Sequence, residues 1–190
     1  MNPGEVLAFW FGAPGTPARG QKRDAWFRQD AAFDSAIGSH FGALHEEAAA
    51  GGLAAWEREP DSAVALVVVL DQFSRNLHRG SPRAFAQDAR ALALSRSIIE
   101  RQWDRARLPV ERQFVYLPFE HSEGLADQDR AVALIGSLEA FEATRGLTEW
   151  AEKHRVIIRR FGRFPHRNAA LGRASTPEEV EFLKQPGSSF

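Results

Sequence analysis

The sequence contains no cysteine, and this absence removes several kinds of chemistry. Without a thiol there is no disulfide framework, no thiolate nucleophile, and no zinc or iron–sulfur site with cysteine ligands. The sequence also lacks the zinc and di-iron ligand spacings, a phosphate-binding glycine-rich loop, a Gly-x-Ser-x-Gly elbow and a dinucleotide fingerprint. His40 and His45, five residues apart, match none of these patterns. We therefore expect no metal site and no cofactor.

Neither sign of charge is in excess, because 24 Lys and Arg residues face 25 Asp and Glu residues. A chain without a strong overall field does not attract nucleic acid or an anionic membrane, so any basic patch must be local. No apolar stretch reaches the roughly 18 residues of a membrane span, and the N-terminus lacks the pattern of a signal peptide. These absences predict a cytoplasmic protein without a nucleic-acid or membrane partner, and they leave the oligomeric state open.

Helix signals, in contrast, are frequent, and strand signals are almost absent. The chain of 190 residues is 44% hydrophobic and 11% aromatic, a globular composition that suits one domain spanning residues 1–190. Caps, first-turn prolines and apolar residues at helical spacing predict an all-α fold. We expect helices at residues 3–10, 24–50, 62–79, 81–99, 109–117, 127–145 and 148–161, and a last one that begins at 177.

A helical hairpin over residues 62–100 is expected at the centre of the domain. Eight consecutive apolar residues, 63–70, indicate a first helix that is buried on all sides. We expect Asp61 to cap this helix, and Val67 and Leu70 to be fully buried within it.

The apolar helix runs directly into a polar stretch, which is the first candidate site. Because the helix starts from the interior, the polar residues that continue it cannot all reach water. Asp71 and Arg75 stand four residues apart with the acid first, the favourable order for an ion pair. A surface pair at a helix end, worth about 0.3–0.5 kcal/mol, is the simpler interpretation. The candidate ligand-binding residues are Asp71, Arg75, Asn76 and Arg79.

A second polar group follows a proline. Pro118 removes a backbone donor, so we expect its helix to kink or end at Leu117 and the segment 118–124 to be irregular. Glu120 and His121 are candidate catalytic residues, because imidazole titrates near neutral pH and a carboxylate can orient it. Adjacent helical residues diverge by about 100°, so the two can cooperate only if the chain turns there. The alternative is a helix end with ordinary polar residues.

The third polar block combines basic and aromatic residues, with arginines at positions 159, 160, 163 and 167. Cations favour helix C-termini, and Gly162 and Pro165 are expected to end the helix, which is the structural explanation. The basic residues continue beyond that end, however, and arginine binds carboxylate and phosphate bidentately, so an anion site is the alternative. The neutral overall charge disfavours single-stranded nucleic acid. The candidate ligand-binding residues are Arg163, His166, Arg167 and Asn168.

The three blocks together resemble a known family. "LDQFSRNLHRGSPRAFAQDARAL", "FVYLPFEHSE" and "FGRFPHRNAALGRASTPEEVEFL", preceded by "VLAFWFG", are similar to the bacterial domain-of-unknown-function family 924, in the expected order over nearly the whole chain. The resemblance implies an all-helical fold similar to the stacked helical hairpins of tetratricopeptide repeats. It implies no established activity and no assigned catalytic residues.

Three interpretations of the polar blocks remain open. In the first, the blocks converge on one cavity that binds a small anionic molecule: the arginines hold its charge, Asn76 and Asn168 orient it, and Glu120 with His121 transfers protons. In the second, the helical stack is a scaffold whose arginines clamp an acidic peptide or a protein C-terminus. In the third, buried ion pairs only fix the helix packing.

Overall fold

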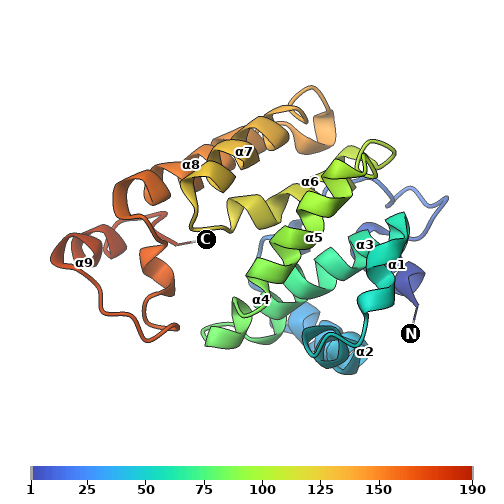
Figure 1. Ribbon diagram of the computed structural model, residues 1–190, viewed down its shortest axis with the longest axis horizontal. Helices are drawn as coiled ribbons and strands as arrows, with labels where there is room; N and C mark the ends of the chain where they lie inside the picture. Colours follow the sequence, from blue (N-terminus) through green and yellow to red (C-terminus); the bar gives the residue numbers. More distant parts are fainter. Residues whose placement is uncertain (1, 190) are drawn as a thin grey trace.

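The computed structural model describes residues 2–189, and within that span every regular element is helical (Figure 1). The predicted all-α fold class is therefore confirmed. The α-helices are α1 (Pro3–Phe11), α2 (Ala31–Ala49), α3 (Pro60–Val67), α4 (Ser74–Leu77), α5 (Asp88–Glu100), α6 (Pro109–Glu120), α7 (Leu125–Gly136), α8 (Leu147–Phe161) and α9 (Pro177–Leu183). A π-helical segment, Val68–Phe73, joins α3 to α4. Across residues 2–189, no helix is both long enough and apolar enough to span a membrane.

Side-chain caps set several helix ends where the sequence predicted them. The Asn2 side chain accepts a hydrogen bond from the Glu5 amide, and the Glu5 carboxylate accepts one from the Asn2 amide, at 3.0 and 3.1 Å. Thr176 and Glu179 form the same reciprocal box at the start of α9. Gly162 ends α8 with φ of 69°, a left-handed conformation that residues with a Cβ rarely adopt. These three helix ends are confirmed.

The centre of the molecule is a continuous helical run that begins at Pro60 and comprises α3, the π segment and α4. Every residue from 62 to 74 is buried, and Val67 and Leu70 are 1% and 0% exposed, as predicted. The predicted cap was wrong, because Pro60 suits the first helical position and the helix starts two residues earlier, with Glu59 as its N-cap. Asp61 consequently lies in the first turn.

Two helices begin later than the sequence predicted. In the range 24–50, the first residues form only a 3₁₀ turn, and α2 begins at Ala31. The reason is Asp30, whose side chain accepts hydrogen bonds from two amides of the next turn and so caps a new helix. In the range 81–99, the serine cap likewise starts only a 3₁₀ turn, and α5 begins at Asp88.

Two predicted helix ends are also wrong. Pro118 does not end α6, which continues to Glu120, so the expected irregular segment 118–124 is confirmed only from His121 onward. The proline removes a single backbone donor, and the buried residues on both sides of it, Leu117 and Phe119, keep α6 packed against the core. The helix expected over residues 127–145 begins at Leu125 and ends at Gly136, and a 3₁₀ turn follows before α8.

Aromatic side chains fill the core between α1, α6 and the central run. The fully buried ring of Trp10 lies 5.6 Å from that of Phe73 and 5.5 Å from that of Phe114, both edge-on. The Trp26 ring lies 4.8 Å from Phe114. Full burial of such a side chain contributes about 1.5–3 kcal/mol, and edge-to-face pairs add about 0.5–1.5 kcal/mol. This packing anchors the run that carries the polar residues.

The second half of the chain covers one side of α6. Helices α7 and α8 lie side by side, and α9 lies at the end of the molecule away from α1 (Figure 1). A small apolar cluster of Ile157, Ile158 and Phe164 joins α8 to the turn that follows it. The C-terminal end of α6, the central run and the turn after α8 therefore meet, and the candidate site lies there.

Candidate functional site

The π segment carries the residue at the centre of the site. A π-helix contains more residues per turn than an α-helix, so its side chains leave the α-helical register. All six residues of the segment are buried, including Asp71 with no exposed surface and Gln72 with 7%. Buried polar groups need partners, and π segments occur frequently at functional sites. The contacts of Asp71 therefore define the site.

Three side chains hold the Asp71 carboxylate. Its Oδ1 accepts a hydrogen bond from His121 Nδ1 at 2.7 Å and lies 3.1 Å from Arg75 Nη1. Its Oδ2 accepts a hydrogen bond from the Gln72 amide. Burial alone would raise the pKa of Asp71, but the charge of Arg75 and the two hydrogen bonds outweigh it and hold the pKa below its usual range. Asp71 is therefore a buried, ionised carboxylate.

His121 is a neutral base at this position. Burial and the positive charge of Arg75 lower the pKa of His121, although Asp71 acts in the opposite direction. At neutral pH the ring therefore donates its Nδ1 proton to Asp71 and carries a lone pair on Nε2. Nε2 has no hydrogen-bond partner among residues 2–189, and 13% of the side chain is exposed. This geometry fits a general base that a carboxylate orients.

Asp88, in the first turn of α5, joins the first polar block to the third. Arg75 donates two hydrogen bonds to its carboxylate, at 2.9 and 3.0 Å, in a bidentate arrangement. Arg167 reaches the same carboxylate at 3.3 Å and donates a second hydrogen bond, at 3.0 Å, to the His121 carbonyl. Arg75, His121 and Arg167 thus come together from three distant parts of the sequence. We call Asp71, Arg75, Asp88, His121 and Arg167 the Asp71 cluster.

Arg167 is a buried cation with incomplete pairing. Only 7% of its side chain is exposed, and its guanidinium lies 4.7 Å from the centre of the Phe85 ring and 4.4 Å from that of Phe164. Its Nε atom is buried and has no hydrogen-bond partner among residues 2–189. Burial and the charge of Arg75 lower the pKa of Arg167 to about 10, although Asp88 opposes them. Arg167 is therefore still charged at neutral pH, although burial and Arg75 oppose its charge.

Glu120, the other candidate catalytic residue, pairs with a different histidine. Its Oε1 lies 3.0 Å from Nδ1 of His154, and the same nitrogen lies 2.8 Å from the Trp150 carbonyl. The His121 and His154 ring centres are 6.4 Å apart. The expected pairing of Glu120 with His121 is not formed, because α6 is still regular there and adjacent side chains diverge. Two carboxylate–histidine pairs lie next to each other instead.

His166 borders the same region. Its ring centre lies 5.6 Å from that of Phe164. Burial, followed by the charges of Arg167 and His154, lowers the pKa of His166 to about 3. The imidazole is therefore uncharged at neutral pH, so any contact that it makes with a ligand is a hydrogen bond rather than an ion pair.

Asn76 and Arg79 of the first block contact α2 instead. The Asn76 amide donates to Asp34 at 2.7 Å, and the Arg79 guanidinium donates to the same carboxylate at 2.7 and 3.0 Å. Burial would raise the pKa of Asp34, but these hydrogen bonds and the charge of Arg79 outweigh it and lower the pKa. The two residues thus form a separate ion-pair group on the side of the run that faces α2.

Arg163 and Asn168 of the third block contact α9. Arg163 binds Glu179 bidentately, at 2.7 Å for both bonds, and the Asn168 amide donates to Glu179 at 3.3 Å. A pocket of about 450 Å³ borders the Arg163–Glu179 pair. Arg75, His121 and Arg167 therefore come together as predicted, whereas Arg163 and Asn168 belong to a second group. Neither this pocket nor the one described below is lined by Arg75, His121 or Arg167, so a shared cavity stays a prediction.

The sequence did not reveal several acidic partners. Asp88 lies within the first block, and its position at a helix start could have marked it. Glu123 accepts hydrogen bonds from the Phe164 amide at 2.8 Å and from Arg173 at 2.7 and 2.9 Å. Arg173 lies 50 residues from Glu123, and no local pattern links them.

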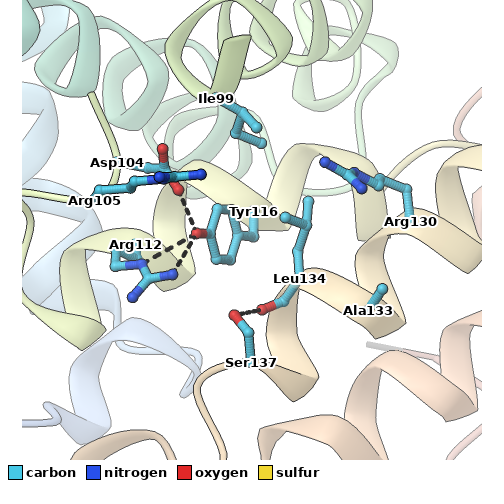
Figure 2. A pocket seen from close by; sticks show the side chains of 9 residues that line it. All are labelled: Ile99, Asp104, Arg105, Arg112, Tyr116, Arg130, Ala133, Leu134 and Ser137. Atoms are coloured by element: carbon cyan, nitrogen blue, oxygen red, sulfur yellow. Dashed lines mark hydrogen bonds between the residues drawn. The ribbon is translucent and has the colours of Figure 1, made fainter. Parts of the chain in front are cut away.

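A second pocket lies between α5, α6 and α7 and has a volume of about 230 Å³ (Figure 2). On its wall, the Tyr116 hydroxyl donates to Asp104 at 2.6 Å and accepts from Arg112 at 3.0 Å. Burial, together with the hydrogen bond to Asp104, raises the pKa of Tyr116 to about 12. The hydroxyl keeps its proton at neutral pH and its bonds are satisfied within the protein, so Tyr116 is not a candidate acid or base.

The chain resembles known proteins over nearly its whole length. The model of a family of bacterial proteins of unknown function, DUF924, matches residues 6–187. A solved structure of a protein of unknown function from Agrobacterium tumefaciens has a TM-score of 0.83 and 39% sequence identity, and the similarity covers 96% of each chain. No curated protein matches the chain. These similarities show the family and the fold, and they assign no activity to the site.

Proposed function

This chain belongs to the DUF924 family of bacterial proteins of unknown function, and we propose that it binds a small anionic molecule at the Asp71 cluster and exchanges a proton with it through His121. Arg167 and Arg75 hold the negative charge of the ligand, and Asp71 orients the imidazole. The proposal concerns a class of ligand, a carboxylate or a phosphate, rather than one compound.

The incomplete pairing of Arg167 is the observation that carries this proposal. Asp88 gives both of its oxygens to Arg75, at 2.9 and 3.0 Å, and makes only a 3.3 Å contact with Arg167. Asp71 is occupied by His121, Gln72 and Arg75. Arg75 therefore contacts two carboxylates, whereas the buried guanidinium of Arg167 reaches a carboxylate only through the 3.3 Å contact with Asp88. An oxyanion beside Arg167 would supply the missing acceptor, because guanidinium binds carboxylate and phosphate through paired N–H donors.

His121 supplies the chemical step. With Nδ1–H directed at Asp71, the lone pair of Nε2 can take a proton from a bound molecule and return it elsewhere on the same molecule. Protonation of the ring is compensated by the ionised Asp71 at 2.7 Å. A positioned base of this kind contributes about 10²–10⁴-fold to a rate. Isomerisation and hydrolysis with an activated water are the reaction classes that need only such a group.

A scaffold for an acidic peptide has less support. A peptide clamp needs exposed arginines with free donors, and the arginine with incomplete pairing is 7% exposed. The more exposed Arg79, at 38%, already binds Asp34. A small ligand that penetrates to Arg167 fits this distribution better than a peptide on the surface.

A thermal-shift screen tests the proposal directly. The probes are inorganic phosphate, sulfate, short mono- and dicarboxylates, and an acidic peptide, each compared with chloride at equal ionic strength. A ligand at a hundred times its dissociation constant raises the stability by about 2.7 kcal/mol. We expect a small oxyanion to stabilise the wild type and not the Arg167→Gln variant.

Arg79→Gln is the matched control, because it removes an arginine of the first block that binds Asp34 outside the cluster. It should respond to the anion as the wild type does. His121→Gln should keep the binding, since the arginines remain, and should abolish any turnover found for the ligand. If no small anion acts beyond ionic strength, or if Arg167→Gln responds like the wild type, the anion site is refuted. Stabilisation by the peptide alone would favour the scaffold.

A further inference from the structure

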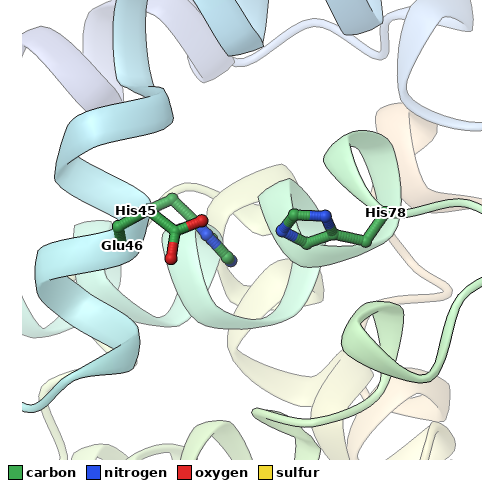
Figure 3. Close-up of side chains that lie close together, drawn as sticks. All are labelled: His45, Glu46 and His78. Atoms are coloured by element: carbon green, nitrogen blue, oxygen red, sulfur yellow. The ribbon is translucent and has the colours of Figure 1, made fainter.

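Two histidines and one glutamate outside the Asp71 cluster bring their ligand atoms together. His45 and Glu46 belong to α2, and His78 follows the last turn of α4. One atom from each side chain lies within 4.8 Å of the other two, and the imidazole centres are 5.2 Å apart. Figure 3 shows the two rings projecting toward each other from their two elements. We propose that this group, the histidine site, binds a divalent transition-metal ion.

The tautomer of His45 is fixed in the form that binds metal. Its Nε2 lies 2.8 Å from Ser74 Oγ, and the Ser74 hydroxyl donates to the Leu70 carbonyl at 2.6 Å. Because the hydroxyl has a single hydrogen, it must accept from Nε2–H of the neutral ring. The lone pair of His45 is therefore on Nδ1. Protein ligands of metals are commonly prepared in this way, by a hydrogen bond from the other ring nitrogen.

The nitrogens that face the site are unpaired. His45 Nδ1 and His78 Nε2 are both buried, and neither has a hydrogen-bond partner among residues 2–189. A buried polar atom without a partner costs about 1–3 kcal/mol. In the tautomer of His78 with the proton on Nδ1, both orphaned atoms are lone pairs. One cation placed between the two rings satisfies both at once.

Glu46 completes the group and gives it access to solvent. Its side chain is 59% exposed and pairs with Arg83, which is 54% exposed. An exposed ion pair contributes at most about 1 kcal/mol, so this contact does not prevent one carboxylate oxygen from turning to a metal. The other oxygen can remain with Arg83. The carboxylate also supplies the negative charge that a divalent ion needs.

The ligand set selects the class of metal. Imidazole nitrogens suit Zn²⁺, Co²⁺, Ni²⁺ and Cu²⁺, whereas Mg²⁺ and Ca²⁺ prefer sites made only of oxygen atoms. Ligands at about 2.0–2.1 Å from a tetrahedral zinc ion are roughly 3.4 Å from one another. Small side-chain rotations bring atoms from within 4.8 Å to that spacing. Three protein ligands leave the fourth position for water or for another ligand.

Titration of the metal-free protein, without an affinity tag, tests this proposal. Isothermal titration with Zn²⁺ should give one equivalent per chain, and Co²⁺ should give the visible absorption bands of a tetrahedral site, which Zn²⁺ removes. Loss of an outer-shell partner already weakens metal binding by about 10–100-fold. We therefore expect His78→Gln, which deletes a direct ligand, to weaken Zn²⁺ binding by at least about tenfold.

His40→Gln is the matched control, because His40 is exposed on the same helix and outside the group, and it should leave the affinity unchanged. Glu46→Gln changes an exposed side chain, so it keeps the fold, and it should weaken binding as well. Circular dichroism verifies that each variant is folded. The proposal is overturned if no saturable equivalent binds, if His78→Gln and Glu46→Gln bind Zn²⁺ like the wild type, or if His40→Gln loses as much affinity.

Discussion

The Asp71 cluster and the histidine site both contain residues of the central helical run or its end, but they differ in how completely their buried polar atoms are paired. In the Asp71 cluster, three side chains hold the buried carboxylate, and the imidazole of His121 is one of them. In the histidine site, two buried imidazole nitrogens face each other without partners. A dense group of charges can therefore be largely self-satisfied, and the unpaired atoms, including Arg167 Nε, are better indicators of where a ligand belongs.

The largest effect is expected from the loss of the central carboxylate of the Asp71 cluster. Asp71→Ala removes the partner of His121 and leaves Arg75 with Asp88 alone in a buried position. Removal of one member of a buried ion pair costs about 3–5 kcal/mol. Urea unfolding at neutral pH should show a loss of this size in the free energy of unfolding. A loss below about 1 kcal/mol would mean that the cluster contributes little to the fold.

The next largest effect is the stabilisation that Zn²⁺ should produce at the histidine site. If the histidine site lacks a ligand, Zn²⁺ should stabilise the protein, by about 2.7 kcal/mol at a hundred times its dissociation constant. Thermal unfolding with and without Zn²⁺ measures this, and Asp71→Ala should gain as much as the wild type. Equal stabilisation of His78→Gln by Zn²⁺ would show that the ion acts elsewhere.

Acid should lower the free energy of unfolding through His166 and the Asp71 cluster that it borders. The pKa of His166 is lowered to about 3, so the folded state stays neutral where the unfolded chain, with a value near 6.5, takes up a proton. Stability from this group is present above pH 6.5 and is lost as the pH falls toward 3, at no more than about 1.4 kcal/mol per pH unit. His166→Gln should flatten that slope in denaturant titrations. An unchanged slope would contradict the assignment.

Protonation of Asp71 should lower the free energy of unfolding further at still lower pH. Its folded pKa lies below the ordinary value of 3.8, so its contribution is present above that value and is lost as the pH falls further. In Asp71→Asn, this last part of the acid transition should be smaller than in the wild type.

The smallest effect concerns the exposed pair. Arg79→Ala breaks a contact with Asp34 in which the arginine is 38% exposed. Exposed ion pairs contribute about 0.2–1 kcal/mol, so the free energy of unfolding should fall by no more than that. If the loss were as large as that of Asp71→Ala, the ion pair of Arg79 would contribute as much to stability as the Asp71 cluster around Arg75.

The fold was largely predictable because its signals are local. Caps and prolines marked the ends of α1, α8 and α9, and the apolar run marked the buried centre. Boundaries failed where 3₁₀ turns intervene, since the same serine or aspartate can cap a turn or a helix. The π segment could not be predicted, because its apolar residues fit an α-helix equally well.

The site was predictable only in part. Polar residues in an interior stretch identified Asp71, Arg75 and His121, because burial demands partners whatever the fold is. The choice of partner depends on tertiary packing, so Asp88 and the role of Glu120 beside His154 could not be derived. His78 has no spacing to His45 that a ligand pattern describes; only the packing of α2 against the central run brings them together.

The continuous helical run and the cap residue that follows it carry residues of both proposed sites. Asp71 and Arg75 serve one site, and Ser74 and His78 serve the other, within a single stretch of eight residues. A metal that drew His78 toward α2 would pull on the same backbone that carries Arg75. If zinc changes the affinity for an anion by some factor, the anion must change the affinity for zinc by that factor too. Two titrations performed in opposite order would then report one coupling free energy, and its sign would say whether the sites assist or oppose each other.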